Sequence, residues 1–319
     1  MTTYGYTLMG EGHEPRELVR NAVLAEEAGF DFAVLSDHYH PWLPSQEHSP
    51  FTWTVLGAVA HATSRLGLAT MVTCPIIRYH PAIVAQAAAT VGVMSEGRFT
   101  LGLGTGERLN EHVVGQGWPS ADDRQEMLRE AIDIVRLLWS GEYVSHRGRW
   151  FTVEDARIFD LPPDPIDIFV AASGAQSATL AAQAGDGICA VEPLGELVEA
   201  YVGAGGDAGA TWGQLPMSWH TDDQKALERA HDQFRFGVPG WKVMAELPNP
   251  VNFAAATETV RPEDMADSVA YGPDPERHVE MITKYVDAGF QRVAVVDIGE
   301  DPEGFLRFWT EEVRPRLPS

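Results

Sequence analysis

The chain has 319 residues, 45% of them hydrophobic and 22% charged, a composition that indicates a folded soluble protein and excludes disordered and collagen-like chains. Its 23 lysines and arginines against 46 aspartates and glutamates give a formal charge of −23, which disfavours nucleic acid and anionic membranes as partners. Because the sequence has no apolar run of the roughly 18 residues that a membrane span needs, and no signal-peptide pattern at its start, we expect a cytoplasmic protein.

Apolar segments of strand length alternate with amphipathic segments of helix length along the chain. The first helix ends before Gly29, a residue type favoured just beyond helix C-termini. We predict strands at residues 4–9, 32–36, 66–73, 98–104, 168–172, 188–191, 215–220 and 292–297. We predict the helices that follow them at residues 14–28, 52–62, 82–94, 122–139, 176–184, 195–202, 222–234 and 302–313.

Strand–helix pairs repeated in this way favour a (β/α)8 TIM barrel, for which about 250 residues are typical, over an open doubly wound sheet. The surplus length falls in two insertions, at about 142–165 and about 237–272. Tyr143, Trp150 and Phe151 suggest a hairpin in the first of them. No linker composition divides the chain, so we expect residues 1–319 to form a single barrel domain with insertions at its C-terminal face.

Polar residues follow many of the predicted strands, at the face where TIM-barrel active sites form. Serine, aspartate, threonine and asparagine at such places could be helix caps, but caps do not explain a histidine, a glutamate and a tryptophan together. The polar strand ends are Ser36-Asp37-His38-Tyr39-His40-Pro41-Trp42, Gly104-Thr105-Gly106-Glu107 with Asn110 beyond, Ala172-Ser173-Gly174, Glu192, Trp219 with His220, and Asp297.

His38 is the strongest acid/base candidate, because imidazole exchanges a proton near neutral pH and the neighbouring Asp37 could orient it. A hydrogen-bonded histidine near the core is the alternative. Glu107 is a candidate general acid, whereas Gly106 before it could simply supply a turn with positive φ. Trp42 could form a wall of a pocket for a planar ligand, or it could pack within its loop.

His38 and His40 also raise the hypothesis of a metal-dependent barrel hydrolase, because side chains two residues apart on an extended segment point the same way. Such a site needs further ligands, and Glu192, His220 or Asp297 would have to supply them. The two cysteines have no metal-site spacing, and we expect two buried thiols rather than a disulfide or a zinc cluster. We therefore predict no metal site.

Five segments of the chain resemble the bacterial luciferase-like superfamily and, more closely, its F420-dependent branch, which the F420-dependent glucose-6-phosphate dehydrogenases typify. The similarity covers most of residues 1–190 and 273–315, and the region of about 193–270 departs most. The segments are SDHYHPW at 36–42, CPIIRYHPAIVAQAAAT at 74–90, GLGTGERLN at 102–110, LLWSGE at 137–142 and AASGAQSATLAAQAGDG at 171–187.

The resemblance implies a TIM-barrel homodimer that binds coenzyme F420, a deazaflavin that transfers hydride. It implies that His38 is the base for a substrate hydroxyl, that Trp42 shapes the site, and that Glu107 is a proton partner near the reduced ring. Met71 and Val72 fall where the family has a non-prolyl cis peptide. The remaining residues that the resemblance places at the cofactor are Asp37, Thr105, Gly106 and Asn110, with the backbone of Ala172, Ser173, Gly174 and Ala175 at its phosphate.

An alcohol dehydrogenase of this kind needs a base for the hydroxyl proton, and we expect His38 and Glu107 to face one cavity from opposite ends of the transfer. Sugar-phosphate members of the family hold the phosphate with lysines and arginines. Residues 192–206 contain neither type, and residues 253–272 offer only Arg261. We therefore expect a neutral or cationic alcohol or ketone as substrate rather than glucose 6-phosphate.

Two other functions are compatible with the same barrel. An FMN-dependent monooxygenase would use reduced flavin and oxygen, although the SDHYHPW and GTGE segments argue against it. A non-catalytic flavin- or deazaflavin-binding barrel would bind the cofactor without turnover.

Overall fold

Parallel strands close into a barrel in the computed structural model, which describes residues 1–318; Ser319, the last residue of the predicted domain, lies outside the described residues. Within residues 1–318 eight strands follow one another around the barrel in the order β1, β2, β3, β4, β7, β8, β9, β11, and β11 pairs with β1 to close it. This closed barrel confirms the predicted fold class. The strands are β1 (Thr3–Thr7), β2 (Phe32–Leu35), β3 (Gly67–Thr70), β4 (Phe99–Leu103), β7 (Ile168–Ala171), β8 (Gly187–Ala190), β9 (Thr211–Ser218) and β11 (Arg292–Asp297).

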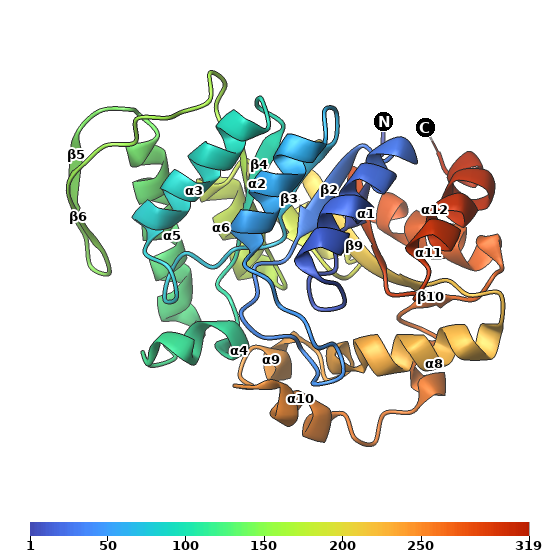
Figure 1. The fold of residues 1–319 in the computed structure, drawn as a ribbon. Helices are drawn as coiled ribbons and strands as arrows, with labels where there is room; N and C mark the ends of the chain where they lie inside the picture. Colours follow the sequence, from blue (N-terminus) through green and yellow to red (C-terminus); the bar gives the residue numbers. More distant parts are fainter. Residues whose placement is uncertain (319) are drawn as a thin grey trace.

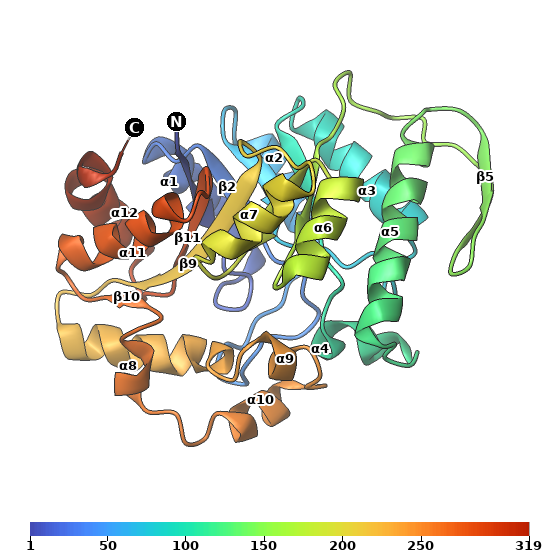
Figure 2. The ribbon, with the colours of Figure 1, turned by 180° about the vertical axis from the view of Figure 1, so that it is seen from behind.

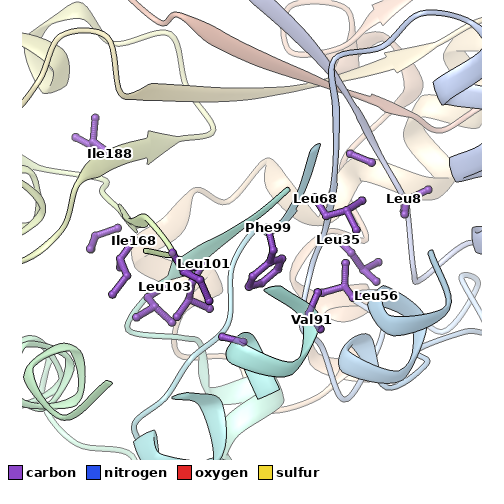
Figure 3. Packing of buried hydrophobic residues seen from close by; sticks show 14 of the residues in the cluster. Leu8, Leu35, Leu56, Leu68, Val91, Phe99, Leu101, Leu103, Ile168 and Ile188 are labelled. Atoms are coloured by element: carbon purple, nitrogen blue, oxygen red, sulfur yellow. The ribbon is translucent and has the colours of Figure 1, made fainter. Parts of the chain in front are cut away.

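Helices surround the barrel and bury their apolar faces against it (Figures 1 and 2). Leu56 and Val91, from the second and third of them, lie beside Phe99 of β4 in one continuous apolar cluster (Figure 3). Each such side chain contributes roughly 1.5–3 kcal/mol when fully buried. The surrounding helices are α1 (Pro15–Glu27), α2 (Thr52–Ala62), α3 (Pro81–Met94), α5 (Ala121–Leu138), α6 (Ala175–Ala184), α7 (Gly195–Gly203), α11 (Pro275–Asp287) and α12 (Pro302–Phe308).

Aromatic side chains fill the N-terminal half of the barrel interior. The Trp212 ring stacks on Phe169, with ring centroids 4.6 Å apart, and meets Phe32 edge-on at 4.9 Å. Gly102 makes room for this packing, because a Cβ atom there would lie 2.0 Å from the Thr70 carbonyl oxygen and 2.4 Å from the Phe169 ring. The interior is thus a packed core, as in other TIM barrels.

The helix predicted at 222–234 does not pack beside the barrel, and this corrects the predicted alternation. Helix α8 (Asp223–Phe234) lies across the C-terminal end with α9 (Trp241–Met244) and α10 (Pro250–Ala256) (Figure 1). Its Leu227 packs with Met9 and Val296, close to the ends of β1 and β11. The helix beside the barrel is α11, which was not among the predicted helices although His278, Ile282 and Tyr285 form a buried stripe at helical spacing.

Only the second insertion lies at the predicted C-terminal face, because the first connects α5 to β7 and therefore leaves the N-terminal end of the barrel. The first forms an antiparallel hairpin of β5 (Val144–Arg147) and β6 (Thr152–Ala156) that projects to one side of the molecule (Figures 1 and 2). The second contains α9, α10 and the two-residue strand β10 (Ala270–Tyr271), which pairs with β9. None of the helices within residues 1–318 is long and apolar enough to cross a membrane.

Candidate active site

The loop after β2 carries Asp37, His38 and Trp42 at the C-terminal end of the barrel. The start of this loop is fixed to the neighbouring strand end, because the Ser36 hydroxyl donates a hydrogen bond to the Met71 carbonyl at 3.2 Å. The loops after β1 and β4 bring further side chains to the same place. The site is therefore assembled from three loops that are distant in sequence.

His38 lies between two carboxylates. Its Nδ1 atom is hydrogen-bonded to Glu11, and its Nε2 atom lies 3.7 Å from Oε1 of Glu107. The side chains of all three residues are largely buried. His38 and Glu107 thus face each other directly. Their expected placement at opposite ends of the hydride transfer stays a prediction.

The two carboxylates favour the charged form of His38. Burial lowers the pKa of the imidazole, but the ion pair with Glu11 and the nearby Glu107 outweigh it, so the pKa of His38 is raised above its ordinary value. Burial raises the pKa of Glu11, but its pairing with His38 outweighs this and lowers the pKa below its ordinary value. Both shifts describe the same ion pair.

Glu11 orients His38, whereas the sequence analysis assigned this part to Asp37. Directly after a strand, adjacent side chains point in different directions, so Asp37 and His38 diverge. Glu11 follows the first strand closely in sequence, and examining the loop after that strand in the same way as the others would have found it.

Asp37 instead belongs to a buried polar cluster with Arg78. Its Oδ2 accepts from the Thr73 hydroxyl at 2.9 Å, and its Oδ1 accepts from Arg78 at 3.1 Å and from the Tyr79 hydroxyl at 3.3 Å. Arg78 also faces Glu111, whose Oε1 lies 3.6 Å from the arginine Nε. Burial raises the pKa of Glu111 to about 7, although Arg78 lowers it. Sequence reasoning missed Arg78 and Glu111, although both lie within or beside the quoted segments.

A tight turn places Glu107 at the start of the short helix α4 (Arg108–Glu111), in a stretch predicted as loop. Gly106 has a φ of 68°, and a Cβ atom there would lie 2.6 Å from the Cys74 sulfur. A glycine is therefore required on both conformational and steric grounds.

Asn110 links the loop after β2 to the loop after β4. Its Oδ1 accepts from the main-chain N–H groups of Tyr39 at 2.7 Å and His40 at 2.8 Å. Its Nδ2 donates to the Glu107 carboxylate. The Asn110 side chain is buried.

Trp42 meets the imidazole of His38 edge-on, with ring centroids 5.0 Å apart. It also stacks on Phe236 at 4.8 Å with an interplanar angle of 4°, and Phe253 of α10 packs against it at 5.2 Å. The segment of α8 to α10 therefore covers Trp42 and holds it against His38.

Small side chains lie together at the ends of β3, β4 and β7. The peptide bond between Met71 and Val72 is cis, as the resemblance implies. Gly104 allows the Val72 side chain to approach, since a Cβ atom there would lie 2.7 Å from it and 3.4 Å from the Ala171 Cβ. Thr105 follows and is partly exposed.

The segment after β7 leads into the N-terminus of α6. Ala172 is buried, whereas Ser173 and Ala175 are exposed and Gly174 is the capping residue. The main-chain N–H groups of Ser173 and Gly174 donate to the Ser177 hydroxyl at 3.2 and 3.3 Å. The first N–H groups of the helix have no acceptor within it, so this end favours an anion.

The other polar residues at strand ends do not contact His38; Glu192 is exposed, and the rest have partners elsewhere. Burial raises the pKa of Asp297 to about 7, but this carboxylate binds its own loop. Glu192 is exposed, Trp219 stacks on Phe308 at 5.8 Å, His220 accepts from the main chain of Asp222 at 2.9 Å, and Asp297 accepts from that of Gly299 at 3.0 Å.

The histidine pair does not form a metal site in this geometry. His40 turns its Nδ1 to the Leu109 carbonyl at 3.1 Å, while Nδ1 of His38 is bonded to Glu11. Across residues 1–318 no three histidine, cysteine, aspartate or glutamate side chains are grouped as metal ligands would be. The hydrolase hypothesis therefore has no support in the structure.

Comparisons with known proteins agree over nearly the whole chain. The family described as luciferase-like monooxygenase matches residues 2–292. An F420-dependent glucose-6-phosphate dehydrogenase of Microbacterium testaceum is 37% identical over 98% of this chain and 97% of its own length. An F420-dependent hydroxymycolic acid dehydrogenase of Mycobacterium tuberculosis is 38% identical over 98% of this chain and 88% of its own length.

Solved structures give the same fold. An F420-dependent secondary alcohol dehydrogenase, solved in complex with an F420–acetone adduct, has a TM-score of 0.91 and 28% identity, covering 100% of this chain and 99% of that one. A coenzyme F420-dependent tetrahydromethanopterin reductase from Methanopyrus kandleri has a TM-score of 0.79 at 22% identity, covering 99% of each chain, and supports the fold alone.

Proposed function

Because this chain belongs to the luciferase-like monooxygenase family, in its F420-dependent branch, we propose that it is an F420-dependent oxidoreductase that interconverts an alcohol and its ketone or aldehyde. The observation that carries this proposal is the position of His38, bonded to Glu11 on one side and facing Glu107 on the other. A base held in this way is what removal of a hydroxyl proton requires.

The residues present fit the cofactor. Val72, Gly104 and Ala171 form a side of the site without large side chains, which suits a flat ring. We propose that Asp37, Met71, Val72, Thr105, Gly106, Glu107 and Asn110 hold the ring and its chain. The N-terminus of α6 supports a phosphate site at the backbone of Ala172, Ser173, Gly174 and Ala175.

Bound F420 would supply the two-electron hydride chemistry. In alcohol oxidation, Nε2 of neutral His38 accepts the hydroxyl proton while the carbinol carbon gives up its hydride. Glu11 stabilises the imidazolium that results, because the pair is buried. Glu107 lies beside the same nitrogen and serves as the second proton partner. Trp42 excludes water on one side of the imidazole. Carbonyl reduction uses the same groups in the reverse protonation states.

We propose a neutral alcohol or ketone as substrate rather than glucose 6-phosphate. Arg261, the cation that residues 253–272 offer, is exposed and already bonded to Asp264 at 2.8 Å. Arg277 is likewise paired with Asp223 at 2.7 Å. A dianionic phosphate binds stably where several cations converge, and these pairings speak against it here.

We also propose that the protein acts in the cytoplasm as a homodimer of single-domain subunits. The free buried thiols Cys74 and Cys189 support a reducing compartment. An apolar groove of about 330 Å³ between α2 and α3 supports a second copy as its occupant. The 11 residues of α2 and the 14 of α3 include no lysine, arginine, aspartate or glutamate, so two copies of charge −23 can meet there without facing charges.

The test is anaerobic mixing of the purified protein with oxidised F420 and a panel of secondary alcohols, primary alcohols and glucose 6-phosphate. We expect loss of the visible absorption of oxidised F420 with at least one neutral alcohol, and little with the sugar phosphate. Turnover of reduced FMN with oxygen, and none of F420, would support the monooxygenase instead. Efficient oxidation of glucose 6-phosphate would contradict the substrate proposal alone.

His38→Ala separates catalysis from binding. We expect F420 affinity to be retained within a few-fold and turnover to fall roughly 100-fold or more, because the base is lost. His40→Ala is the matched control, since His40 lies in the same loop as His38 but contacts the main-chain carbonyl of Leu109 and not Glu107. Equal turnover in His38→Ala and the wild type would indicate a non-catalytic binding barrel.

A further inference from the structure

Asn110 makes three hydrogen bonds, and its orientation is dictated by the main chain. The two groups that face one end of its side-chain amide are the N–H donors of Tyr39 and His40. Only the amide oxygen can accept from two donors, so the NH2 group must face Glu107. A flipped amide would set its NH2 group against these two part-buried N–H groups and remove the acceptor from both.

This orientation constrains Glu107. The NH2 group of Asn110 donates to Oε1 of Glu107, so that oxygen must act as an acceptor. A carbonyl oxygen accepts better than a hydroxyl oxygen, so a proton on Glu107 is favoured on Oε2. The same amide also fixes the main chain one and two residues beyond His38. One buried side chain therefore sets the geometry of both members of the facing pair.

We propose that Asn110 is a positioning residue that holds the loop of His38 and, by donating to Oε1 of Glu107, favours Oε2 as the site of a proton on that carboxyl. This inference rests on the proposed function, which needs His38 and Glu107 as proton partners. It adds that Asn110 positions both of them. The titratable groups around Glu107 are His38, whose Nε2 lies 3.7 Å from Oε1, and Glu111 and Cys74, whose pKa values the charge of Glu107 helps to raise.

Asn110→Asp is the informative variant because it is nearly isosteric. The introduced carboxylate keeps an oxygen for the N–H groups of Tyr39 and His40 but places its second oxygen against Oε1 of Glu107. Two carboxylates in contact then share one proton or repel each other. The double variant Asn110→Asp/Glu107→Gln restores a hydrogen bond between the two positions. The donor is now the glutamine amide at position 107, and the acceptor is the carboxylate at position 110.

The first readout is thermal unfolding of the cofactor-free protein between about pH 5 and pH 8. In Asn110→Asp the pair formed by the introduced carboxylate and Glu107 binds its shared proton more tightly in the folded protein than in the unfolded chain. The protonated pair therefore stabilises the fold at low pH, and this stabilisation is lost as the pH rises. We expect the Tm deficit of Asn110→Asp relative to wild type to grow with pH, and to grow much less in the Glu107→Gln background. The proposal would be overturned if the Tm deficit of Asn110→Asp depended on pH equally in the wild-type and Glu107→Gln backgrounds. A purely structural role of Asn110 in its loop predicts that result, because such a role does not involve the Glu107 carboxylate.

The second readout is the pH profile of kcat with F420. We expect it to shift towards alkaline pH by roughly one unit in Asn110→Asp. An unshifted profile would contradict control of Glu107 by Asn110. F420 turnover by the wild type tests the proposed function separately, since the unfolding experiment needs no cofactor.

A third measurement keeps the proposal testable if Asn110→Asp does not fold. The side-chain amide resonance of Asn110 is followed by NMR against pH in the wild type and in Glu107→Gln. We expect the chemical shift of the Asn110 amide to change with pH in the wild type. In Glu107→Gln, the part of this change that arises from the Glu107 carboxylate should disappear. Identical titration in both proteins would overturn the proposal.

Discussion

At the scale of single residues, the site depends on how His38 is flanked. A histidine bonded through Nδ1 to a buried carboxylate keeps its ring orientation and leaves Nε2 to exchange a proton with substrate. Its raised pKa makes it a stronger base but leaves it protonated over a wider pH range. Alcohol oxidation, which needs the neutral ring, should therefore increase with pH, and carbonyl reduction should decrease.

Glu11→Gln tests this arrangement. The variant removes the charge that raises the pKa of His38, so the acid limb of the kcat profile for alcohol oxidation should move to lower pH. The plateau of kcat should fall roughly tenfold, because the base is weaker and the imidazolium is less stabilised. The measurement is kcat against pH, with Glu27→Gln on the exposed end of α1 as control. A profile identical to wild type would show that Glu11 does not set the proton affinity of His38.

At the scale of elements, buried polar contacts join the loops at the barrel mouth. Arg78, beyond β3, donates to the main-chain carbonyl of Asp37 at 2.6 Å, and its own N–H donates to Glu111 of α4 at 2.8 Å. The arginine thus connects the segments after β2, β3 and β4. Above them, α8 to α10 hold Trp42 by aromatic stacking.

Arg78→Met should be strongly destabilising because it leaves two buried carboxylates without their cation. We expect a loss of about 3–5 kcal/mol in the free energy of unfolding at neutral pH. Without Arg78 the pKa of Glu111 should rise further above about 7, so the loss should shrink as pH falls and Glu111 becomes neutral. Denaturant unfolding at several pH values measures it, with exposed Arg16→Met as control. A loss independent of pH would point to packing rather than charge.

At the scale of the whole molecule, charge is distributed unevenly over the surface. A chain with a net charge of −23 has an uncharged face on α2 and α3, where Phe51, Ile83 and Met94 are exposed beside the groove. Such a patch is unusual for a monomer surface and typical of an interface. Tyr79 borders this groove and also contacts Asp37, so the patch adjoins the candidate active site.

Ile83→Asp should convert a dimer into a monomer. Two new carboxylates would meet the apolar groove, and we expect the dissociation constant to rise by about 100-fold or more. Sedimentation or light scattering against protein concentration measures it, and Val251→Asp, at an exposed position of α10 outside the groove, is the control. A wild type that is monomeric at micromolar concentration would remove the homodimer proposal.

The sequence by itself determined the barrel and much of its contents. Strand and helix segments follow from local periodicity, and most predicted bounds agree with the structure within a few residues. His38, Trp42 and Glu107 follow from the rule that strand ends form the site, and the resemblance supplied F420 and the cis peptide at Met71. The secondary structure could be predicted because periodicity depends only on residues that are neighbours in sequence. The cofactor and the cis peptide could be predicted because a family shares the sequence pattern that accompanies them.

Only the tertiary structure decided which side chains meet. The partners of His38, the amide of Asn110 between two loops, and Arg78 beside Asp37 join segments that are about 27 to 71 residues apart. The position of α8 across the barrel, with α11 taking the place beside it, was decided in the same way. Periodicity gives the direction of a side chain relative to its own element, but the partner depends on how closure of the barrel brings the loop ends together.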